Sequence, residues 1–447
     1  MPPRTLSDWL AHIELMHPAA IEMGLERMLA LRQRLGLAPS FPIIVVGGTN
    51  GKGSTCAMLE AMLAEAGYRV GCYTSPHLLS YHERVRIGRR DASDHALCES
   101  FAEVEQARGN GSLTYFEFGT LAAVNLFVRA AVDVAILEVG LGGRLDAVNA
   151  FDADCAVITS VDIDHVAYLG DTREAIGFEK AGIFRRGRPA VCADASPPVS
   201  LRAHAATIGA QLIEIGREFD YVGDRLNWRF RRAGADPVVL PYPQLRGAFQ
   251  LSNASAAIVA LSQLRDRLPV PERALRNGLM KASVAGRFQV LRQYPTVIAD
   301  VAHNPHAAAA LAHNLKRSAG GGRSIAVFAM LADKDIDGVV EALKDDIDEW
   351  LVADIREPRG ATAAHLARTL HAHGVSGCIG QFDRPALAYR HALEHLAAAG
   401  DEIIVFGSFH TVADVLREDL TAPVFGHTAF ASTESSAERS PQGVLSV

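Results

Sequence analysis

The residues most able to do chemistry form a short segment from Gly47 to Thr55, with the sequence GGTNGKGST. A β-branched apolar run precedes it and apolar residues at helical spacing follow it, which predicts a turn between a strand and a helix. Consecutive amides in such a turn, together with the helix N-terminus, form a site for phosphate. Lys52 would contact the β- and γ-phosphates, and a hydroxyl of Ser54 or Thr55 would reach Mg²⁺. The segment therefore predicts a nucleoside triphosphate site.

The segment departs from the general P-loop pattern at two positions. Val46 stands where that pattern has its first glycine, and Gly53 stands where it has Ser or Thr directly after Lys52. The prediction therefore rests on the coincidence of a strand, a Gly-Lys pair and a helix. The alternative is a glycine-rich turn that binds nothing.

Three more polar residues follow predicted strands closely. They are Ser75, Glu138 and His165. Ligand sites in open parallel sheets collect at the carboxyl ends of the strands, so we expect these side chains near the phosphate loop. Taken alone, Glu138 is also explained as a loop or capping carboxylate, and His165 as a hydrogen-bonded structural histidine.

The elements that position these residues form an α/β fold. Continuous apolar runs, typical of parallel strands covered on both faces, occur at residues 41–46, 69–73, 133–138 and 155–159. Helical stretches between them predict a doubly wound sheet. A second alternation of strands and helices starts near residue 288. Its strand candidates are residues 296–301, 324–328, 350–355 and 402–406. Weak alternation at 217–245 predicts a small β excursion.

The sequence divides into three parts. Residues 1–286 are expected to form an ATP-binding α/β domain around the phosphate loop, and residues 287–424 a smaller, Rossmann-like α/β domain. The tail at residues 425–447 is rich in Ser, Thr, Glu and Pro, and we expect it to be disordered.

Composition excludes several classes of protein. Of the 447 residues, 49% are hydrophobic and 21% charged, and the net charge is −7, so a nucleic-acid partner is not expected. The six cysteines form no CxxC pair that would indicate zinc or redox chemistry. Neither a signal peptide nor a membrane span is indicated, so we expect a cytoplasmic protein without membrane partners. We expect a monomer, although nothing in the sequence determines the oligomeric state.

Ten segments in order resemble the folylpolyglutamate synthases of the Mur ligase superfamily, in the form that also makes dihydrofolate. They are GTNGKGS at 48–54, TSPHL at 74–78, ERVRI at 83–87, TYFEFGT at 114–120, LEVGLGGRLDAVN at 137–149, DHVAYLG at 164–170, EKAGIFR at 179–185, GRFQ at 286–289, DVAHNPHA at 300–307 and GSFHT at 407–411. The resemblance covers nearly all of residues 15–415. It implies a Mur-ligase-like ATPase domain followed by the smaller domain.

The resemblance implies two Mg²⁺ ions. Their ligands would be Ser54, Ser75, Glu138 and His165. It also implies that Lys180, at an expected helix start, is carbamylated and orients magnesium, because a carbamate offers carboxylate-like oxygens to a hard cation. A solvated or salt-bridged lysine is the alternative. Whether K⁺ is also required stays open.

ATP is the implied co-substrate. The residues implied to bind it are Thr49, Asn50, Gly51, Lys52, Gly53, Ser54, Asn253, Arg287 and Asp300. Lys52, Arg287 and His303 are the catalytic candidates, and Arg287 would neutralise charge on the transferring phosphoryl group. Helix capping is the alternative role for Asn253 and Asp300, and a surface salt bridge is the alternative for Arg287.

A dihydropteroate site is implied by three segments. They comprise Ile21, Glu22, Met23 and Gly24; Thr114, Tyr115, Phe116 and Glu117; and Leu145, Asp146 and Ala147. A flat, polar-edged pterin suits aromatic faces beside hydrogen-bonding groups. Core packing is the alternative for the two aromatic residues. The presence of these segments favours an enzyme with two activities.

The implied reaction joins the amine of L-glutamate to a carboxylate that ATP has first converted to an acyl phosphate. Dihydropteroate is one acceptor, and the γ-carboxyl of a folate is the other. The general base stays open among His303, Ser408 and His410. Two alternatives remain: a Mur-type peptidoglycan ligase, and a nucleotide-binding regulatory protein without ligase activity.

Overall fold

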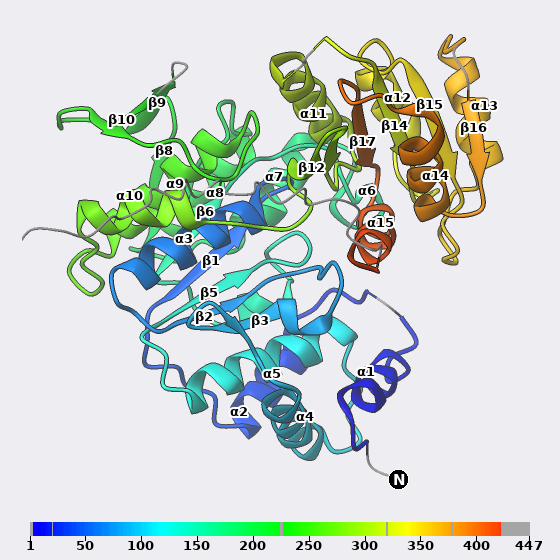
Figure 1. Ribbon diagram of the computed structural model, residues 1–447. Helices are drawn as coiled ribbons and strands as arrows, with labels where there is room; N and C mark the ends of the chain where they lie inside the picture. The colour runs from blue at the N-terminus through cyan, green and yellow to red at the C-terminus, as the bar shows by residue number, and fades with distance from the viewer. Residues whose placement is uncertain (1–2, 20, 224–226, 319–320, 377–378, 422–447) are drawn as a thin grey trace, which may run out of the picture.

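The computed structural model describes residues 3–19, 21–223, 227–318, 321–376 and 379–421. These residues form two α/β units, each built on its own sheet, with a small third sheet on the first unit (Figure 1). The tail at 425–447, for which disorder is expected, lies outside the described residues.

The first unit is built on an eight-stranded sheet in the order β4-β3-β2-β5-β1-β6-β7-β8. The strands are β1 (Ile43–Gly47), β2 (Val70–Tyr73), β3 (Val85–Ile87), β4 (Arg90–Asp91), β5 (Val134–Glu138), β6 (Cys155–Ile158), β7 (Pro189–Cys192) and β8 (Gln211–Glu214). All neighbouring strands are parallel except at the β2-β3-β4 edge, which is antiparallel. β1 lies between β5 and β6, so their carboxyl ends surround the loop that follows β1.

Helices cover both faces of this sheet. One face carries α1 (Leu6–Glu14), α2 (Glu26–Arg34), α4 (Asp94–Arg108), α5 (Tyr115–Arg129), α7 (Arg173–Ala181) and α8 (Val199–Ile208). The other face carries α3 (Lys52–Glu65), α9 (Gln250–Gln263) and α10 (Glu272–Lys281). Short helical turns are η1 (Tyr81–Arg84), η2 (Ala147–Ala150) and α6 (Val166–Leu169). Burial on both faces explains why the central strands have no polar alternation.

The predicted β excursion is an antiparallel sheet of β9 (Phe219–Gly223), β10 (Trp228–Arg232) and β11 (Val238–Leu240). Trp228 and Phe230 alternate with exposed arginines and pack into the same core as α3 and α9. This excursion therefore extends one side of the first unit and leads directly into α9.

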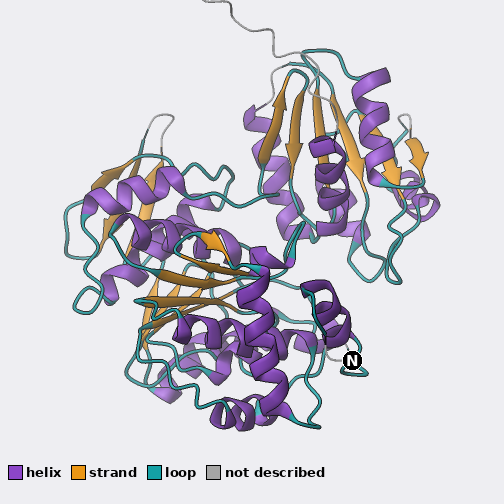
Figure 2. Ribbon diagram, turned by 60° about the horizontal axis from the view of Figure 1, so that its bottom comes forward, coloured by secondary structure: helices purple, strands orange, loops and turns teal. Residues whose placement is uncertain are grey.

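The second unit has a six-stranded sheet in the order β12-β13-β17-β14-β15-β16. Its strands are β12 (Gln289–Gln293), β13 (Thr296–Ala299), β14 (Ser324–Phe328), β15 (Glu349–Ala353), β16 (Ile379–Phe382) and β17 (Glu402–Phe406). Figure 2 shows helices on both faces of this sheet. They are α11 (Pro305–Ser318), α12 (Ile336–Leu343) and α13 (Ala363–Ala372) on one face, and α14 (Pro385–His391) and α15 (Phe409–Thr421) on the other.

The predicted α/β fold class is confirmed, and the long apolar strands lie close to their expected positions. The strands β3, β7 and β16 were not predicted. α14 is followed directly by a π-helical turn, Ala392–Leu396. The predicted boundary between residues 286 and 287 falls in the linker between the units and stays a prediction.

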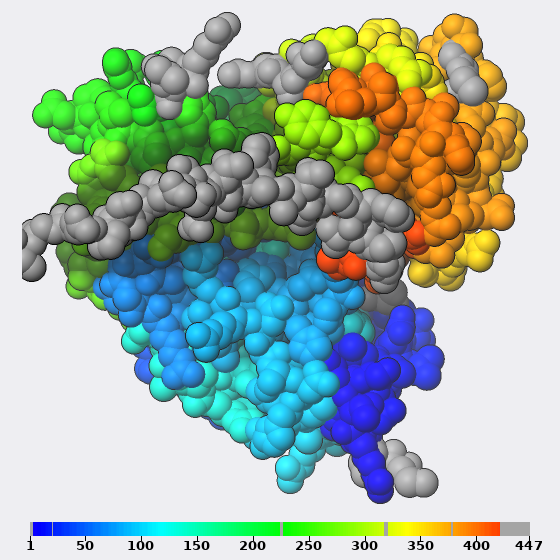
Figure 3. Space-filling model, in the orientation of Figure 1, coloured from blue at the N-terminus to red at the C-terminus, as the bar shows by residue number. Residues whose placement is uncertain are grey.

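One leucine of the first unit joins the core of the second. Leu78, in the loop between β2 and η1, is 6% exposed and belongs to the apolar cluster that contains Val301 and Val412. Its backbone N–H donates to Glu83 Oε2 at 2.8 Å, which fixes the loop. Figure 3 shows the yellow and orange atoms of the second unit as a distinct mass beside the blue and green first unit. Leu78 is thus an apolar anchor between the two.

Candidate active site

A pocket of about 910 Å³ lies where the two units face each other. The first unit contributes the phosphate loop and Ser75, Glu138 and His165. The second contributes Asp300, His303 and Ser408, together with several arginines. The prediction that both units line one cleft is therefore met by the geometry.

The phosphate loop has the backbone that its glycines allow. Gly51 is the N-cap of α3 with φ +87°, and a Cβ there would lie 2.5 Å from Asn253 Oδ1. Gly48 has φ +143°, and a Cβ there would lie 1.9 Å from Thr159 Oγ1. Asn50 N donates to Ser160 Oγ at 3.0 Å. Only glycine fits these two positions, so the turn that exposes the helix N-terminus is fixed.

Lys52 and Ser54 lie at the start of α3, in the pocket. Lys52 Nζ donates to the carbonyls of Gly48 and Thr49 at 3.1 and 3.2 Å, so the ammonium lies folded over the loop. Ser54 Oγ accepts a hydrogen bond from Gln250 Nε2 at 3.3 Å. The loop therefore presents one cation and one hydroxyl beside the helix N-terminus, as a triphosphate requires.

Glu138, at the end of β5, is a buried carboxylate that faces the pocket. Its side chain accepts from Ser75 N at 3.0 Å, and the residue is 3% exposed. Burial raises the pKa of Glu138, while Lys52 and the Ser75 amide oppose that rise. The donor set of one carboxylate with the hydroxyls of Ser54 and Ser75 suits a hard divalent cation. The side chains present thus fit magnesium.

His165 is the N-cap of the short α6 and has φ +53°. Burial lowers its pKa to about 4, with Lys334 and Lys52 adding to the effect and Asp164 opposing it. A neutral imidazole is the form that can bind a metal. No group of three or more His, Cys, Asp or Glu side chains in the described ranges is arranged to hold a metal. The predicted set contains only two such residues, Glu138 and His165, and its metal role stays a prediction.

Lys180 lies in the last turn of α7, so its predicted place at a helix start is wrong. It is 4% exposed and lines the pocket. Burial lowers the pKa of its ammonium to about 7, Lys52 adds to the effect, and Asp164 opposes it. An amine with this pKa is largely neutral near pH 7.5, and the neutral form is the one that reacts with CO₂. Its surroundings therefore fit the predicted carbamate.

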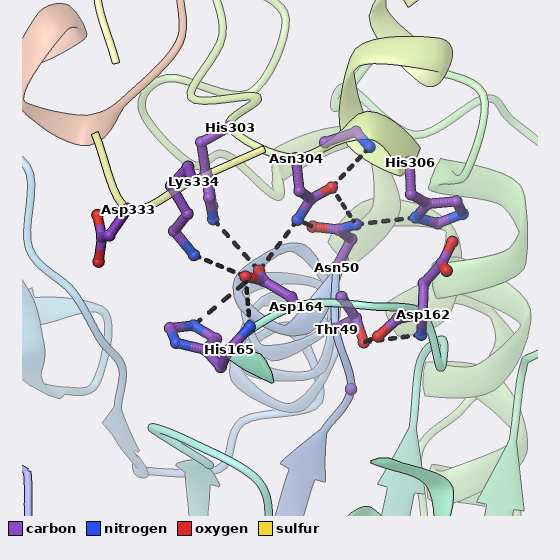
Figure 4. Close-up of polar contacts among 12 residues, drawn as sticks. Thr49, Asn50, Asp162, Asp164, His165, His303, Asn304, His306, Asp333 and Lys334 are labelled. Carbon is purple, nitrogen blue, oxygen red and sulfur yellow. Dashed lines mark hydrogen bonds and ion pairs between the residues drawn. The ribbon is translucent and has the colours of Figure 1, made fainter. Parts of the chain in front are cut away.

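Side chains of both units meet in a polar cluster, here called the interunit network (Figure 4). It comprises Asn50, Asp164, His303, Asn304 and Lys334. The amides of Asn50 and Asn304 exchange two hydrogen bonds of 3.2 Å. Lys334 Nζ lies 2.6 Å from Asp164 Oδ1, and Asn304 Nδ2 donates to Asp164 Oδ2 at 3.2 Å. His303 and Lys334 help to hold the pKa of Asp164 well below its usual range, although burial opposes this.

Arg287 and Asp300 lie at the second unit's side of the pocket. The guanidinium of Arg287 lies 5.2 Å from the Phe409 ring centre, and burial lowers its pKa. Asp300 accepts from Phe288 N and Ala302 N, each at 2.8 Å, so helix capping is not its role. Burial raises the pKa of Asp300, and Arg287 opposes that rise.

The structure also excludes a helix-capping role for Asn253. It lies inside α9, whose N-cap is Phe249, and its side chain reaches the phosphate loop at Gly51. Asn304 does cap α11, since its Oδ1 accepts from Ala307 N at 2.9 Å. It takes part in the interunit network at the same time.

The predicted pterin segments lie beside the pocket and in the core next to it. Phe116 stacks on Tyr73 with ring centres 5.7 Å apart, and its ring packs against Gly140, which lines the pocket. Glu117 accepts from Thr114 N at 2.8 Å and from Arg27. Met23 lies next to Gly142, which lines the pocket. Glu22 pairs with His17 and Arg27, and the ring of Tyr115 lies against Arg84. The pterin role of these segments stays a prediction.

Asp146 has a clear structural task in that region. Its carboxylate accepts from Leu141 N at 2.8 Å and from Val148 N at 3.0 Å, and it is the N-cap of η2. Burial raises its pKa to about 7 despite these bonds. A carboxyl that titrates near neutrality can accept or donate a hydrogen bond.

The three candidates for the general base differ in their surroundings. Ser408 is 4% exposed, and its hydroxyl lies 2.7 Å from that of Thr411. His410 Nδ1 lies 3.9 Å from Glu357 Oε1, and its side chain is about half exposed. His303 Nδ1 lies 2.8 Å from Val301 O, which leaves Nε2 facing Asp164 at 3.7 Å. All three line the pocket, so geometry alone does not choose among them.

Sequence reasoning missed several pocket residues. Asp164 precedes His165 in the same motif, and Lys334 follows the strand β14 at its carboxyl end. His306, in the first turn of α11, lines a smaller neighbouring cavity, and its Nδ1 accepts a hydrogen bond from Asn50 Nδ2 at 2.8 Å. Lys334 could have been found from its position after the carboxyl end of a strand, because the same position indicated Ser75 and His165.

Comparison with known proteins supports this arrangement. Two family profiles match the chain: "Mur ligase middle domain" over residues 46–261 and "Mur ligase, glutamate ligase domain" over residues 286–409. In the part of the chain that the structure describes, no helix is long and apolar enough to cross a membrane.

Named relatives cover most of the chain. The dihydrofolate synthase/folylpolyglutamate synthase of Escherichia coli is 46% identical over 413 residues, which is 92% of this chain and 95% of that protein. The structure of E. coli FolC in complex with DHPP and ADP has a TM-score of 0.87 at 46% identity and covers 93% of this chain and 97% of its own.

A further solved structure is a bifunctional folylpolyglutamate synthase/dihydrofolate synthase with Mn, AMPPNP and L-glutamate bound. It has a TM-score of 0.85 at 46% identity and covers 93% of this chain and 98% of its own. With two lobes, a phosphate loop and this likeness along nearly its whole length, the chain belongs to the dihydrofolate synthase/folylpolyglutamate synthase family of the Mur ligases.

Proposed function

We propose that the chain joins L-glutamate to dihydropteroate, forming dihydrofolate, and to the γ-carboxyl of folates, forming polyglutamates. ATP drives both reactions by converting the acceptor carboxylate to an acyl phosphate, which the glutamate amine then attacks. The observation that supports this most is the pocket between the units, where the phosphate loop faces Arg287 and Asp300. Facing groups on two lobes bring a phosphate donor and its acceptor together and exclude water from a hydrolysable intermediate.

Each nucleotide-binding residue has a defined task in this proposal. Loop amides from Thr49 to Ser54 bind the phosphates, and Lys52 turns from its loop carbonyls onto the β- and γ-phosphates. Arg287 offsets the charge that develops on the transferring group. Asn253 and Asp300 contact the nucleotide from the two sides of the pocket. His303 lies near the phosphates.

Two Mg²⁺ ions would be held by Ser54, Ser75, Glu138 and His165, and when bound they would neutralise phosphate charge. Carbamylated Lys180 would orient them. Burial of Glu138 and Lys180 supports this assignment, because a buried carboxylate and a buried carbamate are stabilised by a cation between them. A monomeric state is a further part of the proposal, while the need for K⁺ stays open.

The acceptor's ring system would lie on the first unit, beside the segments that contain Tyr115, Glu117 and Asp146. Phe116 and Tyr73 provide stacked rings next to Gly140 at the pocket wall. A bifunctional enzyme needs this surface for dihydropteroate, which lacks the glutamate unit that a folate could use as a handle.

One assay tests the proposal. The purified protein is given ATP, Mg²⁺ and L-glutamate with dihydropteroate, with tetrahydrofolate or with a UDP-muramyl acceptor, and ADP and ligated product are measured. We expect product with the first two acceptors and none with the third. Product with the UDP-muramyl acceptor alone would identify a peptidoglycan ligase, and ADP release without any product would contradict the ligase proposal.

A further inference from the structure

Arg84 is held firmly at the wall of the pocket. It is the last residue of η1, and its guanidinium carbon lies 5.6 Å from the Tyr81 ring centre and 5.4 Å from the Tyr115 ring centre. Its Nε donates to His77 Nδ1 at 2.7 Å. Two aromatic faces and one hydrogen bond therefore fix the plane of the guanidinium before any ligand arrives.

The two terminal amino groups of Arg84 face no acidic partner within the described part of the chain. Among the residues that the structure describes, Nη1 and Nη2 of Arg84 have no hydrogen bond or ion pair, although the side chain lines the pocket. Other arginines nearby do have such partners. Arg384 binds Asp414 through Nε and Nη2 at 3.2 and 2.7 Å, and Arg86 pairs with Glu60 at 2.9 Å. Arg84 is thus a preorganised fork of donors with no acceptor among the residues that the structure describes.

Such a fork fits a carboxylate, which accepts two parallel hydrogen bonds from a guanidinium. Arg417 of the second unit lines the same pocket, so the positive potential there comes from both units. Arg84 also belongs to the segment that carries Ser75, and it touches Tyr115 of a predicted pterin segment. These contacts put it on the acceptor's side of the pocket, between the ring system and the reacting carboxyl.

We propose that Arg84 binds the α-carboxylate of the glutamate unit in the folate acceptor and so orients the neighbouring γ-carboxyl for phosphorylation. This inference rests on the proposed ligase function. Dihydropteroate has no glutamate unit and therefore no such carboxylate. Arg84 is then a specificity residue for chain extension that the first reaction does not use.

The test compares both reactions in Arg84→Ala and Arg84→Lys. For tetrahydrofolate we expect KM to rise roughly tenfold to a hundredfold in Arg84→Ala, because a charge-assisted, bidentate contact is lost. Arg84→Lys should recover part of this, since it restores charge without the fork. KM for dihydropteroate should stay within about twofold. The reaction with dihydropteroate also shows whether each variant is still a ligase.

Matched controls decide the remaining outcomes. Arg265→Ala removes an arginine whose side chain is 75% exposed and lies outside the pocket, and it should leave every KM unchanged. A rise in the KM for L-glutamate in both reactions would overturn the folate assignment and place the incoming amino acid at Arg84. Equal losses for both acceptors, or a large fall in melting temperature, would identify a structural role and overturn the proposal. If no ligation occurred in the parent protein, the ligase function itself would fail instead.

Discussion

The phosphate loop and the interunit network line the same pocket but are held together differently. The loop is fixed by neighbours within the first unit, since Asn50 N donates to Ser160 Oγ and Thr159 Oγ1 donates to Asn50 O. The network joins residues that are 170 positions apart at Asp164 and Lys334, and 254 apart at Asn50 and Asn304. The loop can therefore bind phosphates whatever the position of the second unit, whereas the network, and the nucleotide contacts proposed for Asp300, exist only when the units meet.

Lys52→Ala should have the largest effect on catalysis. The loop would keep its shape, because its fixing contacts come from the backbone and from other residues, but it would lose its only pocket-facing cation. We expect both ligation activities to fall by about a thousandfold or more, since phosphoryl transfer relies on charge stabilisation. Steady-state release of ADP with each acceptor measures this. Full turnover in the variant would contradict the assigned role of the loop.

Gly48→Ala should instead break the loop. A Cβ there would collide with Thr159 Oγ1, and its φ of +143° is unfavourable for alanine. We expect the free energy of unfolding to fall by about 2–4 kcal/mol, measured by denaturant titration, together with loss of ATP binding. Gly187→Ala is the matched control, since it has φ +68° but open space around its Cβ. Equal losses in both variants would mean that strain alone, rather than the contact with Thr159, sets the cost.

Asp164→Asn should weaken the network while leaving the loop intact. It leaves Lys334 without its carboxylate, a loss of about 2–5 kcal/mol in contacts between the units. We expect kcat/KM to fall and the distance between fluorescent labels on the two units to widen, with a smaller loss of ATP affinity because the phosphate loop keeps its contacts. Asp333→Asn, at an exposed pair with Arg359, is the control and should leave both readings unaltered. Unchanged label distances in Asp164→Asn would show that the network does not hold the units together.

Lys180 is coupled electrostatically to both regions, because burial chiefly lowers its pKa, Lys52 of the loop adds to this and Asp164 of the network opposes it. Its pKa of about 7 in the folded protein lies below its ordinary value of 10.5, so the unfolded chain binds more protons between these values. The free energy of unfolding should therefore rise with pH across that window, by up to about 1.4 kcal/mol per pH unit.

The pH dependence of the free energy of unfolding is measured for the parent protein and for Lys180→Met in metal-free, bicarbonate-free buffer. The slope should disappear in the variant and persist in Lys281→Met, at an exposed lysine. Adding bicarbonate should give the parent protein a mass increase of one CO₂, and Lys180→Met should not show it. Parallel slopes in all three proteins would exclude a neutral Lys180.

The same contrast explains how far the sequence could predict this molecule. The phosphate loop is contiguous, so its Gly-Lys pair, together with the strand and helix patterns on either side, predicts its turn and its cation. Glu138 and Ser75 were predicted because strand ends share an edge of the sheet. Asp164 and Lys334 carry no such local pattern for their pairing, which depends on where loops of two units meet. The structural tasks of Glu117 and Asp146 in capping were likewise set by the turns around them.

Leu78 gives the molecule a further property. Separation of the two units would either expose this side chain to water, at a free-energy cost of about 1.5–3 kcal/mol, or move the segment that carries Ser75 together with the second unit. Burial of the Leu78 side chain, close to the reacting groups, therefore opposes separation of the two units. An enzyme that makes an acyl phosphate gains from this, because a closed pocket slows the hydrolysis of ATP by water when no acceptor is bound.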